Sequence, residues 1–159
     1  MRIESKLAEM GLALPPPVKV PPGVKLPFSF VRVHDGIAYV SGHGPQSADG
    51  SLAGPFGKLG AELSVEQGYD LAKAVGLSML GSLQRELGDL DRVTAWLRLF
   101  GMVNSVPDFA QQPAVINGCS DLILALYGAE VGAHARSAVG MASLPFGMAV
   151  EIEATVAID

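Results

Sequence analysis

The most regular pattern of hydrophobic and polar positions lies between Ser64 and Gly88. Apolar side chains recur there every three or four residues, the period of a helix with one buried face: Ala72, Val75, Met79 and Leu83. Ser64 can cap the first turn, and Gln67 stands where the second member of a capping box belongs. Glycine often follows the last helical turn, so the expected helix ends at Gly88.

The remaining pattern predicts five strands and a second long helix. A hairpin is expected over 28–41, because the Asp-Gly pair at 35–36 is a strong signal for a tight turn. Residues 42–63 are rich in Gly, Pro and Ser and are expected to form a loop. Residues 113–127 predict the second helix, with Gly128 at its end. Further strands are expected at 93–103, 136–141 and 148–158.

The N-terminal part differs in composition from the rest. Residues 3–10 predict a short helix with one apolar side, stopped by Gly11. Six of the 11 prolines lie between Pro15 and Pro27, and a proline-rich stretch cannot form a helix. We therefore expect an arm over 1–27, made of a short helix and an extended connector, and a single domain over 28–159. The element order indicates an α+β sheet with two helices covering one face.

Composition narrows the classes of protein. A chain of 159 residues is long enough for one domain with its own core. Only 17% of the residues are charged, against about 25% in a typical domain, which favours an oligomer that hides part of its surface. The net charge of −5 argues against a nucleic-acid partner, and the single cysteine, Cys119, excludes an internal disulfide. The sequence contains no run of 18 or more apolar residues, so we expect no membrane span and a cytoplasmic protein.

Several catalytic and cofactor motifs are missing. Gly57-Lys58 is followed by Leu59, where a phosphate-binding loop needs Ser or Thr. No Gly-x-Ser-x-Gly sequence marks a hydrolase nucleophile. The three histidines, at 34, 43 and 134, stand far apart and favour unrelated roles over a shared metal site, so we expect no metal.

Arg136 stands out, because it is the only Lys or Arg after Arg98 and its neighbours are small and apolar. A guanidinium in such surroundings needs an anionic partner. That partner is either an internal carboxylate, Glu151 or Glu153, or the carboxylate of a ligand. The two glutamates are two residues apart and therefore lie on one face of a strand, which by spacing alone favours a solvated surface.

The C-terminal block resembles the signature of the Rid (reactive intermediate deaminase) proteins, also called the YjgF or endoribonuclease L-PSP family. The residues concerned are Ala135-Arg136-Ser137-Ala138-Val139, then Leu144-Pro145, then Val150-Glu151-Ile152-Glu153-Ala154. Tyr39-Val40-Ser41-Gly42 resembles the early Ser-Gly strand end of the family, and Pro107-Asp108-Phe109 with Asn117 resembles its second-helix entry. The resemblance runs from about Phe28 to Ile158, and the proline-rich arm is similar to that of a longer subgroup.

The resemblance implies a chorismate-mutase-like mixed sheet and a homotrimer with ligand sites in clefts between subunits. It implies hydrolysis of enamines and imines such as 2-aminoacrylate to keto acids and ammonia, without a metal or organic cofactor. Arg136 would hold the substrate carboxylate, and Glu151 would position or activate the attacking water. Ser41 and Asn117 would line the pocket, and the backbone at Ala138 would contact the substrate.

The chain departs from the best-described members at three positions. Phe28 replaces a tyrosine, Ala138 replaces a common cysteine, and His43 stands where glutamine is usual. Because Phe28 lacks the hydroxyl of that tyrosine, a second hypothesis is favoured: a trimer that binds a keto acid without turnover. A third hypothesis, an endoribonuclease, is disfavoured by the net charge and by the absence of a basic stripe with aromatic residues.

Overall fold

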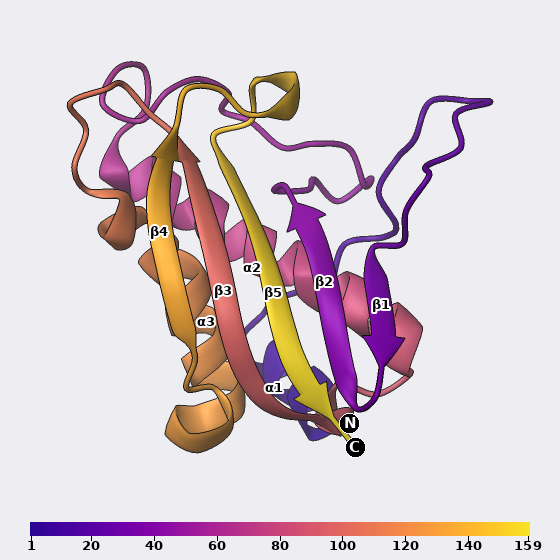
Figure 1. Ribbon diagram of the computed structural model, residues 1–159. Coiled ribbons are helices and arrows are strands. Elements are labelled where there is room, and N and C mark those ends of the chain that lie inside the picture. The colour runs from indigo at the N-terminus through magenta and orange to yellow at the C-terminus, as the bar shows by residue number, and fades with distance from the viewer.

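The computed structural model describes all 159 residues and shows one mixed sheet with helices (Figure 1). The helices are α1 (Arg2–Glu9), α2 (Val65–Leu87) and α3 (Gln112–Val131), with short 3-10 helices at Leu90–Arg92 and Pro145–Gly147. The strands are β1 (Val31–His34), β2 (Ile37–His43), β3 (Val93–Asn104), β4 (Ala135–Met141) and β5 (Val150–Ile158). They lie in the order β1-β2-β5-β3-β4, so β1 and β4 are the two edges.

The sheet is antiparallel except at one edge. β3 and β4 pair in parallel, with Leu99 opposite Arg136, and α3 makes the crossover between them. The other three pairs are antiparallel. The turn between β1 and β2 has positive φ at both Asp35 and Gly36, which is the conformation for which Asp-Gly is favoured.

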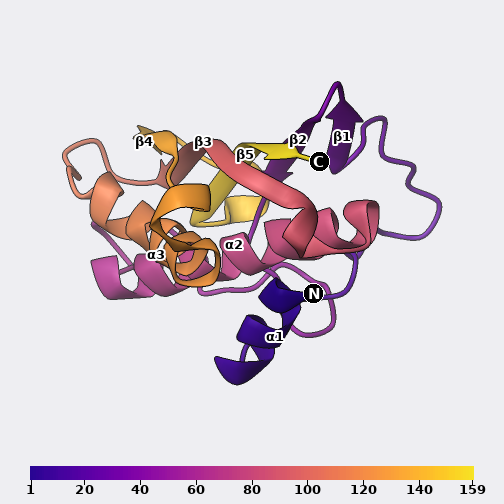
Figure 2. The same cartoon turned by 90° about the horizontal axis from the view of Figure 1, so that it is seen from below.

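Helices α2 and α3 cover one face of the sheet, and the other face is bare (Figure 2). The core lies between the sheet and these helices and includes Trp96, Leu99, Ile116 and Ile152, all 1% exposed or less. By length and hydropathy α3 could cross a bilayer, but half of that stretch is buried within the chain. Its apolar side chains therefore fill the core.

The N-terminal arm is part of this core. The sequence predicts its short helix but assigns only two helices to the packing on the sheet, whereas the core contains side chains of all three. Ile3 and Leu7 of α1 are buried in the same hydrophobic cluster as α2 and α3. The proline connector is held by hydrogen bonds: Lys19 N–H donates to Gly50, and the Gln46 amide donates to the Pro16 carbonyl. The arm expected over 1–27 therefore packs on the domain expected over 28–159.

The predicted elements form with small differences at their ends. Ser64 and Gln67 make the reciprocal capping box, and Gly88 ends α2 in the left-handed conformation. β2 continues past Ser41 to His43, where a loop was expected, through an irregularity in its pairing with β5. α3 leaves helical geometry at Gly128, as predicted, but one further turn follows it.

Candidate functional site

Arg136 lies on edge strand β4 and directs its guanidinium toward α3. One terminal nitrogen donates to the Ser120 hydroxyl at 3.0 Å, and the other donates to the Pro113 carbonyl at 3.2 Å. No carboxylate oxygen lies within 4.0 Å of it, so the internal ion pair with Glu151 or Glu153 does not form. A guanidinium has five N–H donors, and those left over are available to an anion.

A histidine and a serine hold this arginine in place. His134 Nδ1 lies 2.8 Å from the Gly132 carbonyl, which can only accept, so Nδ1 carries the proton. In the neutral ring Nε2 then accepts the hydroxyl proton of Ser120 at 2.8 Å. The lone pairs of Ser120 are thereby turned toward Arg136. This Arg136–Ser120–His134 relay fixes the guanidinium without neutralising it.

Two further residues named by sequence analysis lie beside Arg136. Asn117 is exposed on α3 and shares a helical face with Pro113 and Ser120, because residues three and four apart are neighbours on a helix. Ala138 follows Arg136 by two residues on β4, and side chains two apart point to the same side of a strand. The structure therefore gathers Arg136, Asn117 and Ala138 at one edge of the sheet.

Glu151 lies on β5, on the face of the sheet that no helix covers. Its neighbours Val150 and Ile152 are fully buried while Glu153 is exposed, which confirms the predicted period of two. Burial, and secondarily the negative charge of Glu153, raise the pKa of the Glu151 carboxyl above its ordinary value. Glu151 makes no hydrogen bond or ion pair within the chain, so its carboxylate is free to accept a proton.

Gly42 makes room for this carboxylate. A Cβ atom at position 42 would collide with Oε2 of Glu151. Gly42 lies in the stretch of β2 between Val40 and His43 where the register with β5 shifts. The Ser-Gly pair noted in the sequence therefore has a steric reason, because a side chain at position 42 would push the Glu151 carboxylate from this place.

Ser41 and Phe28 lie toward the β1 edge of the sheet, opposite the β4 edge that carries Arg136. The Ser41 hydroxyl donates to the Ser29 carbonyl at 2.7 Å, and its N–H donates to the Phe30 carbonyl at 2.9 Å. These bonds tie the end of the connector to β2. Phe28 is 52% exposed and packs edge-to-face on Phe30, with ring centroids 5.5 Å apart. Ser41 also borders a hollow of about 280 Å³ on the bare face, together with Tyr39, Arg98, Phe100, Glu153 and Thr155.

A single chain does not bring Arg136 and Glu151 together. Arg136 points to the side of the sheet occupied by α3, and Glu151 points to the bare side. β3 runs between their strands, with Met102 paired to both Glu151 and Val139 (Figure 1). Two strand spacings and three residues of strand separate their Cα atoms by roughly 14 Å. One small ligand cannot contact both side chains of the same chain.

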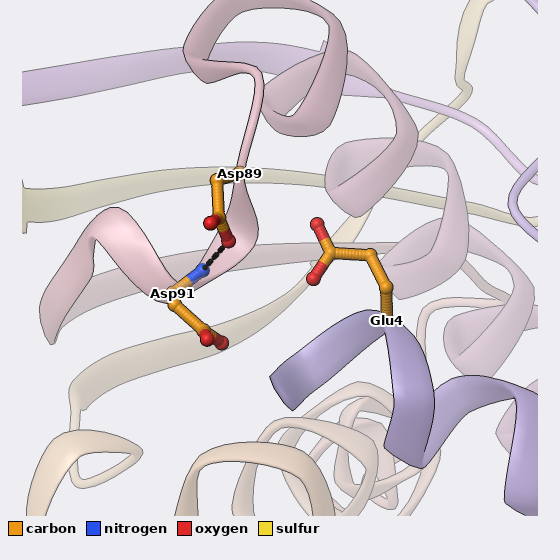
Figure 3. A group of neighbouring side chains, drawn as sticks. All are labelled: Glu4, Asp89 and Asp91. Carbon is orange, nitrogen blue, oxygen red and sulfur yellow. Dashed lines mark hydrogen bonds between the residues drawn. The ribbon is translucent and has the colours of Figure 1, made fainter. Parts of the chain in front are cut away.

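One cluster of carboxylates has the composition of a metal site but a structural role. Figure 3 shows Glu4, Asp89 and Asp91 meeting between α1 and the segment after α2. The Met1 amino group donates to Asp91 at 2.6 Å, and the Leu90 N–H donates to Glu4 at 2.9 Å. Burial opposes ionisation of Asp91, but hydrogen bonds from the amino group and from two backbone N–H groups outweigh it and lower its pKa to about 2. The cluster joins α1 to the core.

Sequence analysis missed Ser120 and His134 as partners of Arg136. The sequence predicts unrelated roles for the three histidines. His34 is an exposed residue paired only with its neighbour Asp35. The usable signal was the spacing of His134 and Arg136, which places both at the start of one strand. Ser120 carried no local signal, because it lies 16 residues earlier and reaches β4 only through the crossover.

The comparisons with known proteins decide the family. The model of the family described as "YjgF/chorismate mutase-like, putative endoribonuclease" matches residues 4–151. This chain belongs to the YjgF family. The match confirms the resemblance found in the sequence and the chorismate-mutase-like α+β fold, and it includes most of the N-terminal arm.

Named relatives of this YjgF-family chain extend over nearly its whole length. Protein TCP17 of Trypanosoma cruzi is 43% identical over 145 residues, which are 86% of this chain and 89% of that protein. The structure of Atu1372 from Agrobacterium tumefaciens, a protein of unknown function, is 37% identical with a TM-score of 0.87, covering 99% and 94% of the chains. A "putative endoribonuclease" from Shewanella oneidensis is 26% identical with a TM-score of 0.88, covering 99% and 100%.

Proposed function

We propose that this YjgF-family protein hydrolyses small enamines and imines that carry a carboxylate, such as 2-aminoacrylate, to keto acids and ammonia. The observation that carries the proposal is Arg136, which is held in place by Ser120 and has no acidic partner in the chain. A fixed and uncompensated guanidinium favours a bidentate carboxylate ligand.

The chemistry assigns one role to each of two side chains. Arg136 holds the substrate carboxylate and so fixes the position of the imine carbon. Glu151 takes a proton from water as the oxygen bonds to that carbon, and the nitrogen leaves as ammonia after protonation. Its raised pKa makes its carboxylate a stronger base than that of an exposed glutamate.

The proposed site requires a second copy of the chain. Because Arg136 and Glu151 lie on opposite faces of one sheet, we assign Arg136 of one protomer and Glu151 of a neighbour to the same cleft. The low charged fraction and the bare sheet face support a homotrimer that buries this face. Light scattering coupled to gel filtration should give three times the 16.5 kDa mass of the chain, and a clean monomer would exclude the shared cleft.

The direct test adds the purified protein to a pyridoxal-phosphate enzyme that releases 2-aminoacrylate. We expect the imine to disappear faster, with pyruvate and ammonia formed together. The Arg136→Ala variant is the matched control, and it should give no acceleration. If the wild type accelerates none of a panel of amino-acid-derived imines, the protein is not this hydrolase.

A second candidate function is the binding of a keto acid without turnover. Phe28 favours it, because a phenyl ring cannot supply the hydroxyl that best-described relatives of this family have at that position. Calorimetry with pyruvate and 2-oxobutyrate separates the two functions: saturable binding that depends on Arg136, in a protein without hydrolase activity, selects the second. Cleavage of a labelled RNA is the corresponding test for the nuclease named among its relatives.

A further inference from the structure

A second hollow lies far from β4, where the connector passes the other edge of the sheet. It measures about 390 Å³ and is bounded by the connector, β1 and the C-terminal half of α2. Its apolar wall consists of Pro17, Val18, Phe30 and Val31, and its polar wall consists of Ser82, Arg85 and Glu86. A cavity of this size and composition suits a small molecule with an apolar body and one polar end.

The polar wall is organised by a buried histidine. His43 is 2% exposed, and its Nδ1 lies 2.5 Å from the Ser41 carbonyl, so Nδ1 carries the proton. Burial lowers the pKa of His43, which keeps the ring neutral, and Nε2 accepts the Ser82 hydroxyl proton at 2.8 Å. Ser82 in turn accepts from Arg85 at 3.2 Å.

This Arg85–Ser82–His43 relay repeats the arrangement at Arg136. In both, Nδ1 of the histidine donates to a carbonyl two residues earlier, Nε2 accepts from a helix serine, and that serine accepts from the arginine. In both, a second carbonyl near a proline takes the other terminal nitrogen: Pro15 for Arg85, at 3.1 Å. The repetition indicates that Arg85 is fixed for the same purpose, to present a guanidinium.

The charges around the hollow fit an anion. Arg85 has no carboxylate oxygen within 4.0 Å. Glu86 is the only acidic residue on the wall, and it does not pair with Arg85. Arg32 also borders the hollow, but it stands opposite Tyr39 in the sheet, so its side chain points to the bare face. The Arg85 guanidinium is therefore the positive group that faces the apolar wall.

We propose that this hollow is a second ligand site, which binds a small carboxylate with an apolar body, and that Arg85 is its main ligand-binding residue. The carboxylate lies on the Arg85 guanidinium. The body of the ligand packs between the connector prolines and β1. One chain supplies every wall, so the site does not depend on the imine hydrolysis proposed above.

The test measures binding of 3-phenylpropionate by calorimetry in the Arg136→Ala background, which removes the other carboxylate site. We expect saturable binding with one ligand per chain and at least a tenfold loss of affinity in Arg85→Gln. Ser82→Ala removes the acceptor that holds Arg85 at 3.2 Å, so it should lose several-fold, and it serves if Arg85→Gln does not fold. Arg2→Gln removes the same charge from exposed α1 and should bind as tightly as the parent.

Inorganic phosphate and acetate are the comparison probes. We expect both to bind more weakly than 3-phenylpropionate, because neither has an apolar body to fill the hollow. Equal affinity for phosphate and 3-phenylpropionate would overturn the assigned ligand class. Absence of saturable binding, or the same affinity in the parent, Arg85→Gln and Ser82→Ala, would overturn the site itself.

Discussion

Arg136 and Arg85 lie near opposite edges of the sheet and are held by the same kind of relay. Each guanidinium rests on a helix serine whose hydroxyl is turned by a histidine, and each has a carbonyl as its second partner. They differ in what faces them. Arg85 lines a hollow whose walls all come from one chain, whereas Arg136 stands on an exposed edge strand. In the two proposals made above, the same local arrangement serves a site within one chain at Arg85 and half of a shared site at Arg136.

The second difference concerns the nearest available base. Glu151 is half-buried, unpaired and has a raised pKa, but it lies on the other face of the sheet from Arg136. Glu86 borders the Arg85 hollow, but it is exposed. We therefore expect chemistry to depend on Arg136 with Glu151 and only binding to depend on Arg85. Variants at the two arginine sites test this division.

The largest effect on the chemical step alone, with ligand binding retained, is expected for Glu151→Gln. Glutamine has nearly the same shape but cannot take a proton from water, so imine hydrolysis should fall about 10²–10⁴-fold, the usual contribution of a general base. Single-turnover measurement with 2-aminoacrylate gives this rate. Keto-acid affinity should persist, because Arg136 is intact. An equally active variant would reduce Glu151 to a residue of the strand surface.

Arg136→Ala should abolish hydrolysis and weaken binding of pyruvate by about 10- to 100-fold, because a charge-assisted hydrogen bond contributes about 1.5–3 kcal/mol. Arg85→Ala should leave the rate of 2-aminoacrylate hydrolysis unchanged, with pyruvate and ammonia still formed. Calorimetry and the coupled assay on both variants, each checked for its trimer mass, test the division. If Arg85→Ala loses hydrolysis as completely as Arg136→Ala, the two sites are not independent.

Replacing either of the two serines should have a smaller effect, and each replacement should weaken the binding of one ligand only. Ser120→Ala removes the acceptor that positions Arg136, and Ser82→Ala does the same for Arg85. Loss of one such bond costs about 1 kcal/mol, roughly a fivefold change in affinity. Ser120→Ala should affect pyruvate alone, and Ser82→Ala should affect 3-phenylpropionate alone. Equal effects of both variants on both ligands would show general loosening of the fold.

The acid limb of the pH profile should carry the signature of Glu151. Glu151 must be ionised to accept a proton, and burial raises its pKa above 4.5. The value of kcat/KM for hydrolysis should therefore fall as the pH drops through a midpoint above 4.5. The residual activity of Glu151→Gln should lack that limb. An unchanged limb in the variant would assign the titration to another group.

Local patterns predicted most of the fold. The capping box of α2, the Asp-Gly turn and the two-residue period of β5 each depend on residues close in sequence, and the structure contains all three. The packing of α1 into the core was not predicted, because Ile3 and Leu7 find their partners more than 80 residues away. The same limit hid the relays, since Ser82 meets His43 across 39 residues. The sequence named Arg136 and Glu151, but it could not tell that they face opposite sides.

The most direct test of a shared Arg136–Glu151 cleft mixes two strongly impaired variants. Arg136→Ala keeps Glu151, and Glu151→Gln keeps Arg136, so a mixed trimer contains one cleft with both native side chains. Unfolding and refolding the variants together at a 1:1 ratio should restore about a quarter of the wild-type hydrolysis rate, because three quarters of random trimers are mixed and each has one intact cleft of three. Each variant refolded alone should stay at about a hundredth of the wild-type rate or below. No recovery in verified mixed trimers would contradict the shared cleft.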